Sequence, residues 1–342
     1  MRLIFDSIVQ ASRLVRVGEF DSATDLDGDL ATLTRAYRAS DVASLITAAF
    51  DDSEANVTGY FANVQDYYTG TAAQLSGVHC ADGAIHFGLD WDGTYRREGF
   101  YEQAKIVEDL VRTNGARSVL EVGPGKGFNS IHLARQNPGI SFTGVDLTPL
   151  HVRLASEGGR GLSNLRFIEG DFHRMTECAD ESFDLAFDVE ATCYSDTPEK
   201  LEMLFSEIHR VLRPGGVFVA FEYCLADSFD DVSTNAQLAV RLVERAWVVD
   251  RFHRESAWNA AAQRSGLRLR ERRDLRQAAM PSIVRLYRQA RMFYLLMATP
   301  LRPMLSKLVR RSTHNAVSAL MLPYTFGSGA LEYRQVMLQK AA

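Results

Sequence analysis

Cysteine is scarce in this chain of 342 residues, and no two cysteines form a C-x-x-C pair. A dense disulfide framework is therefore excluded, and a structural zinc site is not expected. We also expect no bound metal, because the histidines lack further ligands at metal-binding spacing. The pattern favours a reducing, cytoplasmic setting. The four cysteines are Cys80, Cys178, Cys193 and Cys224.

Long apolar runs and excess positive charge are missing as well. The longest apolar stretch, Met292–Leu301, has ten residues, about half of the ~20 that a membrane-spanning helix needs. Asp6 interrupts the first apolar residues, so we expect no secretory signal. There are 38 basic and 43 acidic residues, a net charge of −5, which argues against a nucleic-acid partner.

From about residue 100, short apolar segments alternate with helical patterns, which is typical of βαβ units in a mostly parallel sheet. One helix is expected over Pro198–Leu212, ending at Arg213–Gly216. Ligands bind such sheets at the carboxyl ends of the strands. The expected strands cover residues 118–122, 141–145, 165–169, 183–187, 217–223 and 332–338.

The flanking segments differ from this core. Residues 1–75 predict amphipathic helices, and the Gly-, His- and aromatic-rich residues from 76 to 100 predict a loop over a site. We expect a core domain over 76–224 and a mostly helical substrate-binding region with one late strand over 225–330. A closing strand is expected in 331–342. The region 225–330 is strongly basic in its middle.

A glycine-rich turn follows the first expected strand, in the order Glu121-Val122-Gly123-Pro124-Gly125-Lys126-Gly127. Glycines there let the backbone approach a ligand, and the helix start offers free N–H groups. The dinucleotide fingerprint G-x-G-x-x-G fails because Phe128 occupies its third glycine position, and a P-loop is absent.

The turn instead resembles motif I of class I S-adenosylmethionine (SAM)-dependent methyltransferases. An acid at the strand end, Glu121, suits a cationic ligand better than a diphosphate. The resemblance implies a Rossmann-like α/β fold whose seven-stranded sheet carries helices on both faces. It also implies SAM as the cofactor, with Asp146 (and Leu147 beside it) at the ribose, and Asp171 and Phe172 at the adenine.

The segment Val189–Tyr194, V-E-A-T-C-Y, resembles the I-E-A-T-C-H segment of sterol C-24 methyltransferases. Val189 and Tyr194 are departures from it. His86-Phe87 and Phe221-Glu222-Tyr223 resemble that family's S-F-H-F and Y-E-W segments more loosely. The similarity runs over roughly residues 66–340.

This resemblance implies methylation of an alkene carbon in an isoprenoid, prenyl diphosphate or sterol-like lipid. A π bond can attack the methyl group directly, and the resulting carbocation needs a dry pocket with ring faces and a base. We expect Glu190 to be the acid near the reacting carbon, with Glu222 second and Tyr194 beside them. The expected substrate-binding residues are Tyr67, His86, Phe87, Tyr223, Trp247 and Tyr324.

Several alternatives stay open. The cofactor half fits equally an O- or N-methyltransferase of a small natural product, or a protein that binds SAM without reacting. The basic, apolar stretch 281–311 is compatible with a lid, with an anionic membrane surface or with a diphosphate. The sequence leaves assembly into a homo-oligomer open.

Overall fold

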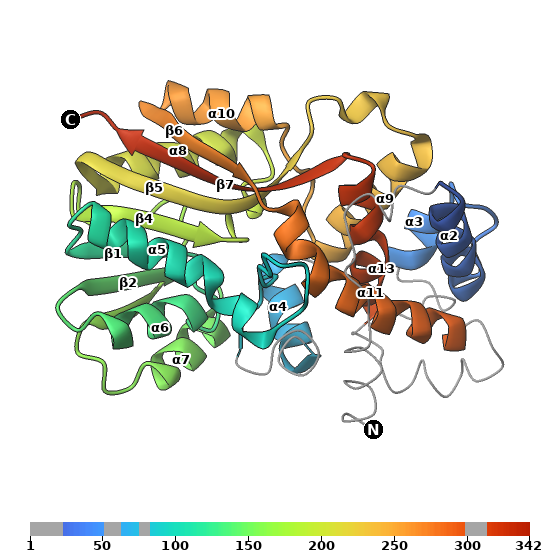
Figure 1. Cartoon of the computed structure of the whole chain (residues 1–342), viewed down its shortest axis with the longest axis horizontal. Coiled ribbons are helices and arrows are strands. Elements are labelled where there is room, and N and C mark those ends of the chain that lie inside the picture. The colour runs from blue at the N-terminus through green and yellow to red at the C-terminus, as the bar shows by residue number, and fades with distance from the viewer. Residues whose placement is uncertain (1–22, 51–62, 75–82, 298–312) are drawn as a thin grey trace.

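One seven-stranded sheet organises the molecule, in the strand order β3-β2-β1-β4-β5-β7-β6 (Figure 1). The computed structural model describes residues 23–50, 63–74, 83–297 and 313–342. Strands β1 to β5 run parallel, and β7 runs antiparallel to both of its neighbours. The mostly parallel Rossmann-like sheet is therefore confirmed. The strands are β1 (Ser118–Val122), β2 (Ser141–Asp146), β3 (Leu165–Glu169), β4 (Phe183–Val189), β5 (Leu212–Leu225), β6 (Leu267–Asp274) and β7 (Leu331–Lys340).

Helices cover both faces of the sheet because successive strand side chains point to opposite sides. Val119 lies in the core that includes the apolar residues of α5, whereas Leu120 lies in the core of α8 and α10. The helices are α2 (Ala23–Tyr37), α3 (Leu45–Phe50), α4 (Val64–Gln74), α5 (Glu102–Thr113), α6 (Phe128–Gln136), α7 (Pro149–Gly158), α8 (Pro198–Val211), α9 (Thr234–Trp247), α10 (Glu255–Arg264), α11 (Arg276–Met297) and α13 (Thr313–Gly327), with short 3-10 turns η3 (Arg97–Tyr101), η4 (Thr192–Tyr194) and η5 (Phe229–Asp231).

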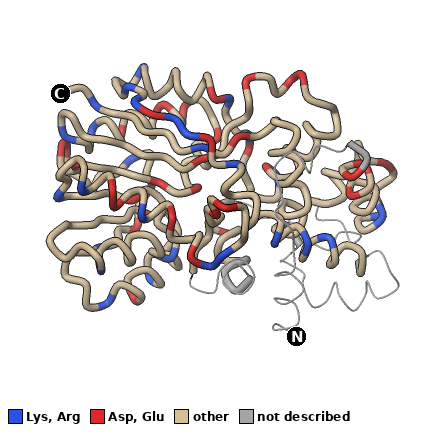
Figure 2. The backbone as a smooth tube through the Cα atoms, in the orientation of Figure 1, with Lys and Arg blue, Asp and Glu red and all other residues tan. Residues whose placement is uncertain are grey.

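Two details of the sheet differ from the sequence expectation. The turn expected at Arg213–Gly216 lies inside β5, where the pairing with β4 jumps from Leu212 to Val217. Gly215, at φ +78°, permits this bulge. The late strand is β6, an edge strand with only Leu267 buried. Its arginines, seen in blue in Figure 2, follow the common use of charge to protect a sheet edge.

Helices α2, α3, α9, α11 and α13 form one helical layer beside the sheet (Figure 1), whereas α10 packs on the sheet together with α8. Helices α2 and α3 pack against α9, and α2 also packs against α11 and α13. The hydroxyls of Tyr37 and Tyr294 lie 2.7 Å apart in this layer. Asp29 accepts hydrogen bonds from Tyr287 (2.8 Å) and Tyr324 (2.7 Å). These buried polar contacts fix how α2, α11 and α13 pack.

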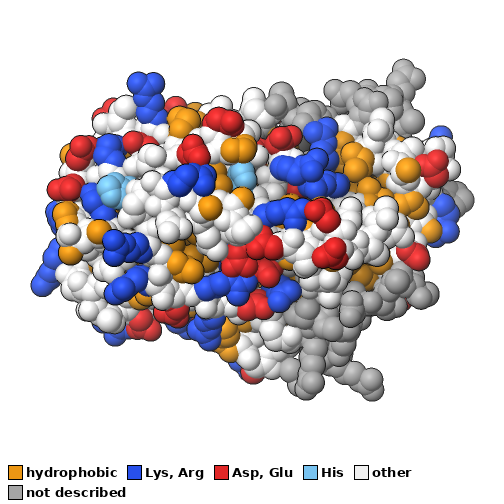
Figure 3. All heavy atoms as spheres, turned by 90° about the horizontal axis from the view of Figure 1, so that it is seen from above, with side chains coloured by type: hydrophobic (Ala, Val, Ile, Leu, Met, Phe, Trp, Pro, Cys, Tyr) orange, Lys and Arg blue, Asp and Glu red, His pale blue; other side chains and the backbone are white. Residues whose placement is uncertain are grey.

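The surface seen from above in Figure 3 mixes acidic and basic side chains, with an apolar area at one end. The exposed large apolar residues of α11, Met292, Leu295 and Leu296, lie shortly before a segment outside the described residues. That segment holds Arg302, Lys307 and the other basic residues up to 311. Among the described helices, none combines the length and apolar character needed to cross a bilayer.

Candidate functional site

The glycine turn joins β1 to α6 in a backbone conformation that requires glycine. Gly123 has φ +63°, and a Cβ atom there would clash with the Cβ of Ala191. Gly127 has φ +80°, and its Cβ would meet Phe167 at 2.7 Å. The turn therefore lies directly against the segment that begins at Glu190. The two sequence motifs meet where β1 and β4, which are neighbours in the sheet, end.

Glu121, in β1, binds the start of α6, the helix that follows the turn. Its carboxylate accepts hydrogen bonds from the Ser130 amide (3.1 Å), the Ser130 hydroxyl and the Asn129 side chain (3.3 Å). Burial raises the pKa of Glu121 to about 7, against the lowering effect of these donors. The side chain thus holds the first turn of α6 in place.

Asp146 ends β2 and binds the glycine turn from the other side. Its Oδ2 accepts the Gly125 N–H at 2.9 Å, and Oδ1 accepts the Thr148 N–H at 2.8 Å. Each carboxylate oxygen has two acceptor positions, so capacity remains for a vicinal diol. His151 lies 3.4 Å from Oδ1, and its buried Nε2 has no hydrogen-bond partner in the described residues.

Helix α4 covers this region. Gln65 donates to the Leu147 carbonyl at 2.8 Å, and the Tyr68 ring lies edge-on to His151 with centroids 4.9 Å apart. The Leu147 side chain itself is 37% exposed. Residues of α4 therefore contact the loop that follows β2 and the first turn of α7.

Asp171 and Phe172 follow β3. The Asp171 side chain is half exposed, and its Oδ1 accepts from both the amide (2.9 Å) and Nδ1 (2.7 Å) of His173. Phe172 is buried and stacks near His173, with centroids 4.5 Å apart. An exposed carboxylate oxygen beside a ring suits an adenine with its exocyclic amine.

These features fit an adenosyl ligand with a positive charge. The glycine turn gives close backbone approach, Asp146 has acceptor capacity for hydroxyls, and His151 leaves a buried polar atom unpartnered at the site. Two carboxylates, Asp146 and Asp171, lie at the carboxyl ends of the neighbouring strands β2 and β3, which favours a cationic ligand over a diphosphate.

Glu190 follows β4 in a strained position. Its backbone has φ +57°, which is uncommon for a non-glycine residue and often marks a functional site. Its Oε1 accepts the Phe87 N–H at 2.9 Å. Burial raises the pKa of Glu190 to about 8, although the facing Tyr223 and Tyr333 hydroxyls act to lower it.

Aromatic residues lie beside this carboxyl group, and the hydroxyls of Tyr223 and Tyr333 face it. The Tyr223 ring lies 4.9 Å from Tyr333, 5.2 Å from Trp247 and 6.5 Å from Phe87, measured between centroids. The Tyr223 hydroxyl is buried without a well-formed hydrogen bond in the described chain. We call this group the ring cluster: Phe87, Tyr223, Trp247, Phe252, Phe326 and Tyr333.

Two buried carboxyls hold the segment after Glu190. Asp188 Oδ2 accepts from the amides of Ala191 (3.3 Å) and Thr192 (3.2 Å). Glu222 accepts from the Cys193 amide at 2.7 Å and from the Thr192 hydroxyl at 3.0 Å. Burial raises the pKa of both acids, and the charge of Glu222 raises that of Asp188 further.

The remaining predicted residues lie in three places. The Tyr194 hydroxyl lies 3.0 Å from that of Tyr68 and 3.2 Å from the Trp247 carbonyl, beside the ring cluster. His86 packs between Phe100 and Phe128, next to the glycine turn. Tyr67 bonds Asn315 of α13, and Tyr324 bonds Asp29 in the helical layer. Tyr67 and Tyr324 therefore make their polar contacts with the helices.

Sequence reasoning missed four residues of the site: Asp188, Gln103, Tyr333 and His173. Gln103 is fully buried on α5 and donates to the Phe87 carbonyl (2.7 Å) and toward the Tyr333 hydroxyl (3.3 Å). Asp188 stands two residues before Glu190 in a buried strand, where an acid is rarely placed without a role. That position was the available signal; the others depend on tertiary packing.

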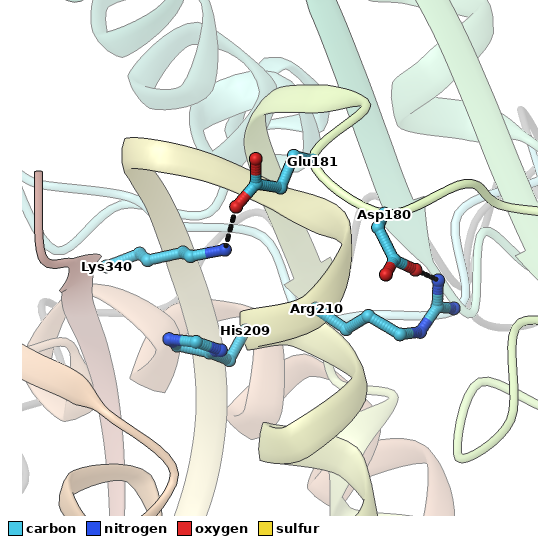
Figure 4. A pocket seen from close by; sticks show the side chains of 5 residues that line it. All are labelled: Asp180, Glu181, His209, Arg210 and Lys340. Carbon is cyan, nitrogen blue, oxygen red and sulfur yellow. Dashed lines mark hydrogen bonds and ion pairs between the residues drawn. The ribbon is translucent and has the colours of Figure 1, made fainter.

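A separate hollow lies at the end of the sheet where the parallel strands begin, near the start of β5 and the end of β7 (Figure 4). Its cations are already paired: Lys340 with Glu181 at 3.2 Å, and Arg210 with Asp180 at 2.7 Å. His209 completes the lining. Because the charges cancel locally and the strand carboxyl ends lie elsewhere, the hollow is distinct from the site at the glycine turn.

Comparison with known proteins agrees with this geometry. Residues 114–266 match the family described as a methyltransferase domain. A sterol 24-C-methyltransferase from Debaryomyces hansenii is 25% identical over 260 residues, 70% of this chain and 68% of that protein. A cycloartenol-C-24-methyltransferase from Arabidopsis thaliana is 30% identical over 150 residues, 43% of each protein. The chain thus matches less than half the length of the second relative.

A solved structure is similar in fold. It is a geranyl diphosphate C-methyltransferase from Streptomyces coelicolor A3(2), in complex with Mg²⁺, geranyl diphosphate and S-adenosyl-L-homocysteine. The two share 16% identity and a TM-score of 0.54, over 80% of this chain and 98% of the other. The methyltransferase family match supports SAM, the cofactor that the resemblance of the glycine turn implies.

Proposed function

We propose that this chain, a class I SAM-dependent methyltransferase similar to the sterol C-24 methyltransferases, methylates an alkene carbon of a neutral isoprenoid or sterol-like lipid. The observation that carries the proposal is the Glu190 carboxyl, placed among the rings of the ring cluster and one residue from the Ala191–Gly123 contact. An acid with ring faces beside a SAM turn is what alkene methylation requires. The C-24 methyltransferase names of the relatives point the same way.

The cofactor contacts follow from the same edge of the sheet. We assign the ribose hydroxyls to Asp146, with Leu147 beside it, and the adenine to Asp171 and Phe172. The glycine turn, Gly123 to Gly127, lies along the amino-acid part of SAM. Glu121 acts on the cofactor indirectly, by holding the start of α6, because its oxygens are already bonded to Ser130 and Asn129.

The chemistry divides between cofactor and protein. Bound SAM supplies an electrophilic methyl group, and the alkene that accepts it becomes a carbocation. The ring cluster stabilises that cation through its π faces and excludes water. Glu190, in its ionised form, then takes a proton from the neighbouring carbon, and the C–H electrons form the new double bond.

Glu222 and Tyr194 have positioning roles in this proposal. Both oxygens of Glu222 are occupied by the Thr192 hydroxyl and by the Cys193 and Tyr223 amides, so the side chain fixes the turn after Glu190. Tyr194 links that turn to the carbonyl of Trp247. Among the six expected substrate-binding residues, Phe87, Tyr223 and Trp247 stand in the ring cluster.

A neutral lipid is favoured over a prenyl diphosphate by charge. Three acids, Asp188, Glu190 and Glu222, converge beside the ring cluster: when protonated they offer a diphosphate no counter-charge, and when ionised they repel it. The solved relative from Streptomyces coelicolor was crystallised with geranyl diphosphate and Mg²⁺, which makes the diphosphate the second candidate. Contact with a membrane surface and assembly into a homo-oligomer stay predictions.

The test is a methyl-transfer assay with isotopically labelled SAM. The acceptors are a sterol with a side-chain double bond, geranyl diphosphate with Mg²⁺, and a phenol. We expect label on carbon in the sterol sample, located by NMR of the extracted product. Label on geranyl diphosphate would establish the second candidate, and label found only on the phenol oxygen would overturn alkene methylation.

A further inference from the structure

A chain of hydrogen bonds leaves the adenine side of the site and reaches the segment after Glu190. Asp171 Oδ1 lies 2.7 Å from His173 Nδ1, and His173 Nε2 lies 2.9 Å from the Ser195 hydroxyl. The imidazole is 9% exposed and Ser195 is fully buried. Loop 170–173 and segment 190–196 are thereby joined through a single ring.

The connectivity matches that of a Ser-His-Asp triad, but the setting excludes acyl transfer. A nucleophilic serine must reach a carbonyl carbon, and Ser195 has no accessible surface. The Ser195 amide, moreover, already donates to the Thr192 carbonyl at 2.9 Å. The three residues therefore have a structural role, which is to connect loop 170–173 to segment 190–196.

The same segment is also attached to the loop that carries the rings. His253 Nε2 donates to the Ser195 carbonyl at 2.7 Å, and Asp196 Oδ2 accepts the Asp250 amide at 2.8 Å. Residues 248–253 follow Trp247 and include Phe252, and both of these aromatic residues belong to the ring cluster. Segment 190–196 thus stands between the adenine loop and the ring-bearing loop.

We propose that His173 is a positioning residue that couples the adenine end of the cofactor site to segment 190–196, so that SAM binding orders the reacting side. The inference rests on the proposed contact of Asp171 with adenine. His173 touches no reacting atom; it acts through Ser195.

One tautomer of His173 satisfies both hydrogen bonds of this connection. Asp171 accepts the Nδ1–H, which leaves Nε2 as the acceptor for the Ser195 hydroxyl. Burial lowers the pKa of His173, although Asp171 and Asp196 act to raise it, so the neutral ring is favoured. An amine bound at Asp171 fixes that carboxylate, and with it the ring and Ser195.

The experiment measures amide hydrogen exchange in segment 190–196 with and without saturating SAM, together with SAM affinity by calorimetry. In the unmodified protein, SAM should slow exchange of this segment by about tenfold. His173→Asn keeps a donor for Asp171 and loses the acceptor for Ser195, whereas Ser195→Ala removes the other partner. In both variants we expect SAM affinity within about threefold and SAM-dependent slowing below about twofold.

His209→Asn, in the hollow at the other end of the strands, is the matched control and should behave as the unmodified protein. The double variant of His173 and Ser195 should show the same residual SAM-dependent slowing of exchange as either single variant, because each variant breaks the same hydrogen bond between the two residues. Full SAM-dependent slowing in either single variant would overturn the coupling. Asp171→Asn separates the two proposals: unchanged SAM affinity there would refute the adenine contact instead.

Discussion

Replacing Glu190 by Gln should abolish turnover while leaving the cofactor site intact. The amide keeps the size of the side chain and an oxygen that can accept the Phe87 N–H, which Glu190 now binds at 2.9 Å. It cannot take a proton. We expect SAM affinity to stay within about twofold and kcat to fall by about 10²–10⁴, the usual contribution of a positioned base.

The magnitude of the pH effect follows from the raised pKa. With the pKa of Glu190 at about 8, about one tenth of the molecules carry the ionised base at pH 7 and about nine tenths at pH 9. The rate should therefore rise by up to about tenfold over this interval. The positive charge of bound SAM lowers the pKa, so the observed midpoint lies at or below 8.

The assay is initial methyl transfer to the accepted alkene from pH 5 to 9, at saturating SAM so that titration of Glu121 does not enter through cofactor binding. Tyr333→Phe serves as a matched variant. Its hydroxyl acts to lower the pKa of Glu190, so its loss should move the midpoint upward. A rate independent of pH, or a midpoint near the ordinary value of glutamic acid, would refute the assignment of Glu190 as base.

Three further outcomes are expected. Gly123→Ala should weaken SAM binding at least about tenfold in calorimetry, because of its positive φ and the Ala191 contact, whereas Gly139→Ala, with open space around it, should bind normally. Glu222→Gln should lower the unfolding free energy by about 1–3 kcal/mol in denaturant titration, because its amide must face a main-chain N–H; equal stability would contradict the positioning role. Burial raises the pKa of Asp90 to about 7, so stability contributed by its protonated form is lost as pH rises from about 4 to 7; Asp90→Asn should remove this slope in thermal unfolding.

The parallel core was predictable because each strand is a short apolar run between helices with a clear period. Strand β6 was harder to locate. Its sequence, L-R-L-R-E-R-R-D, buries only Leu267, so its strand conformation comes from pairing with β7 and not from a core-facing pattern. The bulge at Arg213–Gly216 was likewise expected as a turn, since Pro214 and Gly215 give the same local signal for both.

For the site, motifs located the acids but not their partners. Glu190 and Glu222 look alike in sequence, each an acid at a strand end; packing alone separates them, since every oxygen of Glu222 is bonded within the protein whereas Glu190 faces rings. Tyr324 shows the same limit, because its hydroxyl bonds Asp29, almost 300 residues away in the chain. A role that depends on which donors meet a carboxylate is therefore set by tertiary contacts. The strained backbone of Glu190 is maintained in the same way: Asp188 and Glu222 accept hydrogen bonds from the residues that follow Glu190, and the Phe87 amide binds its side chain.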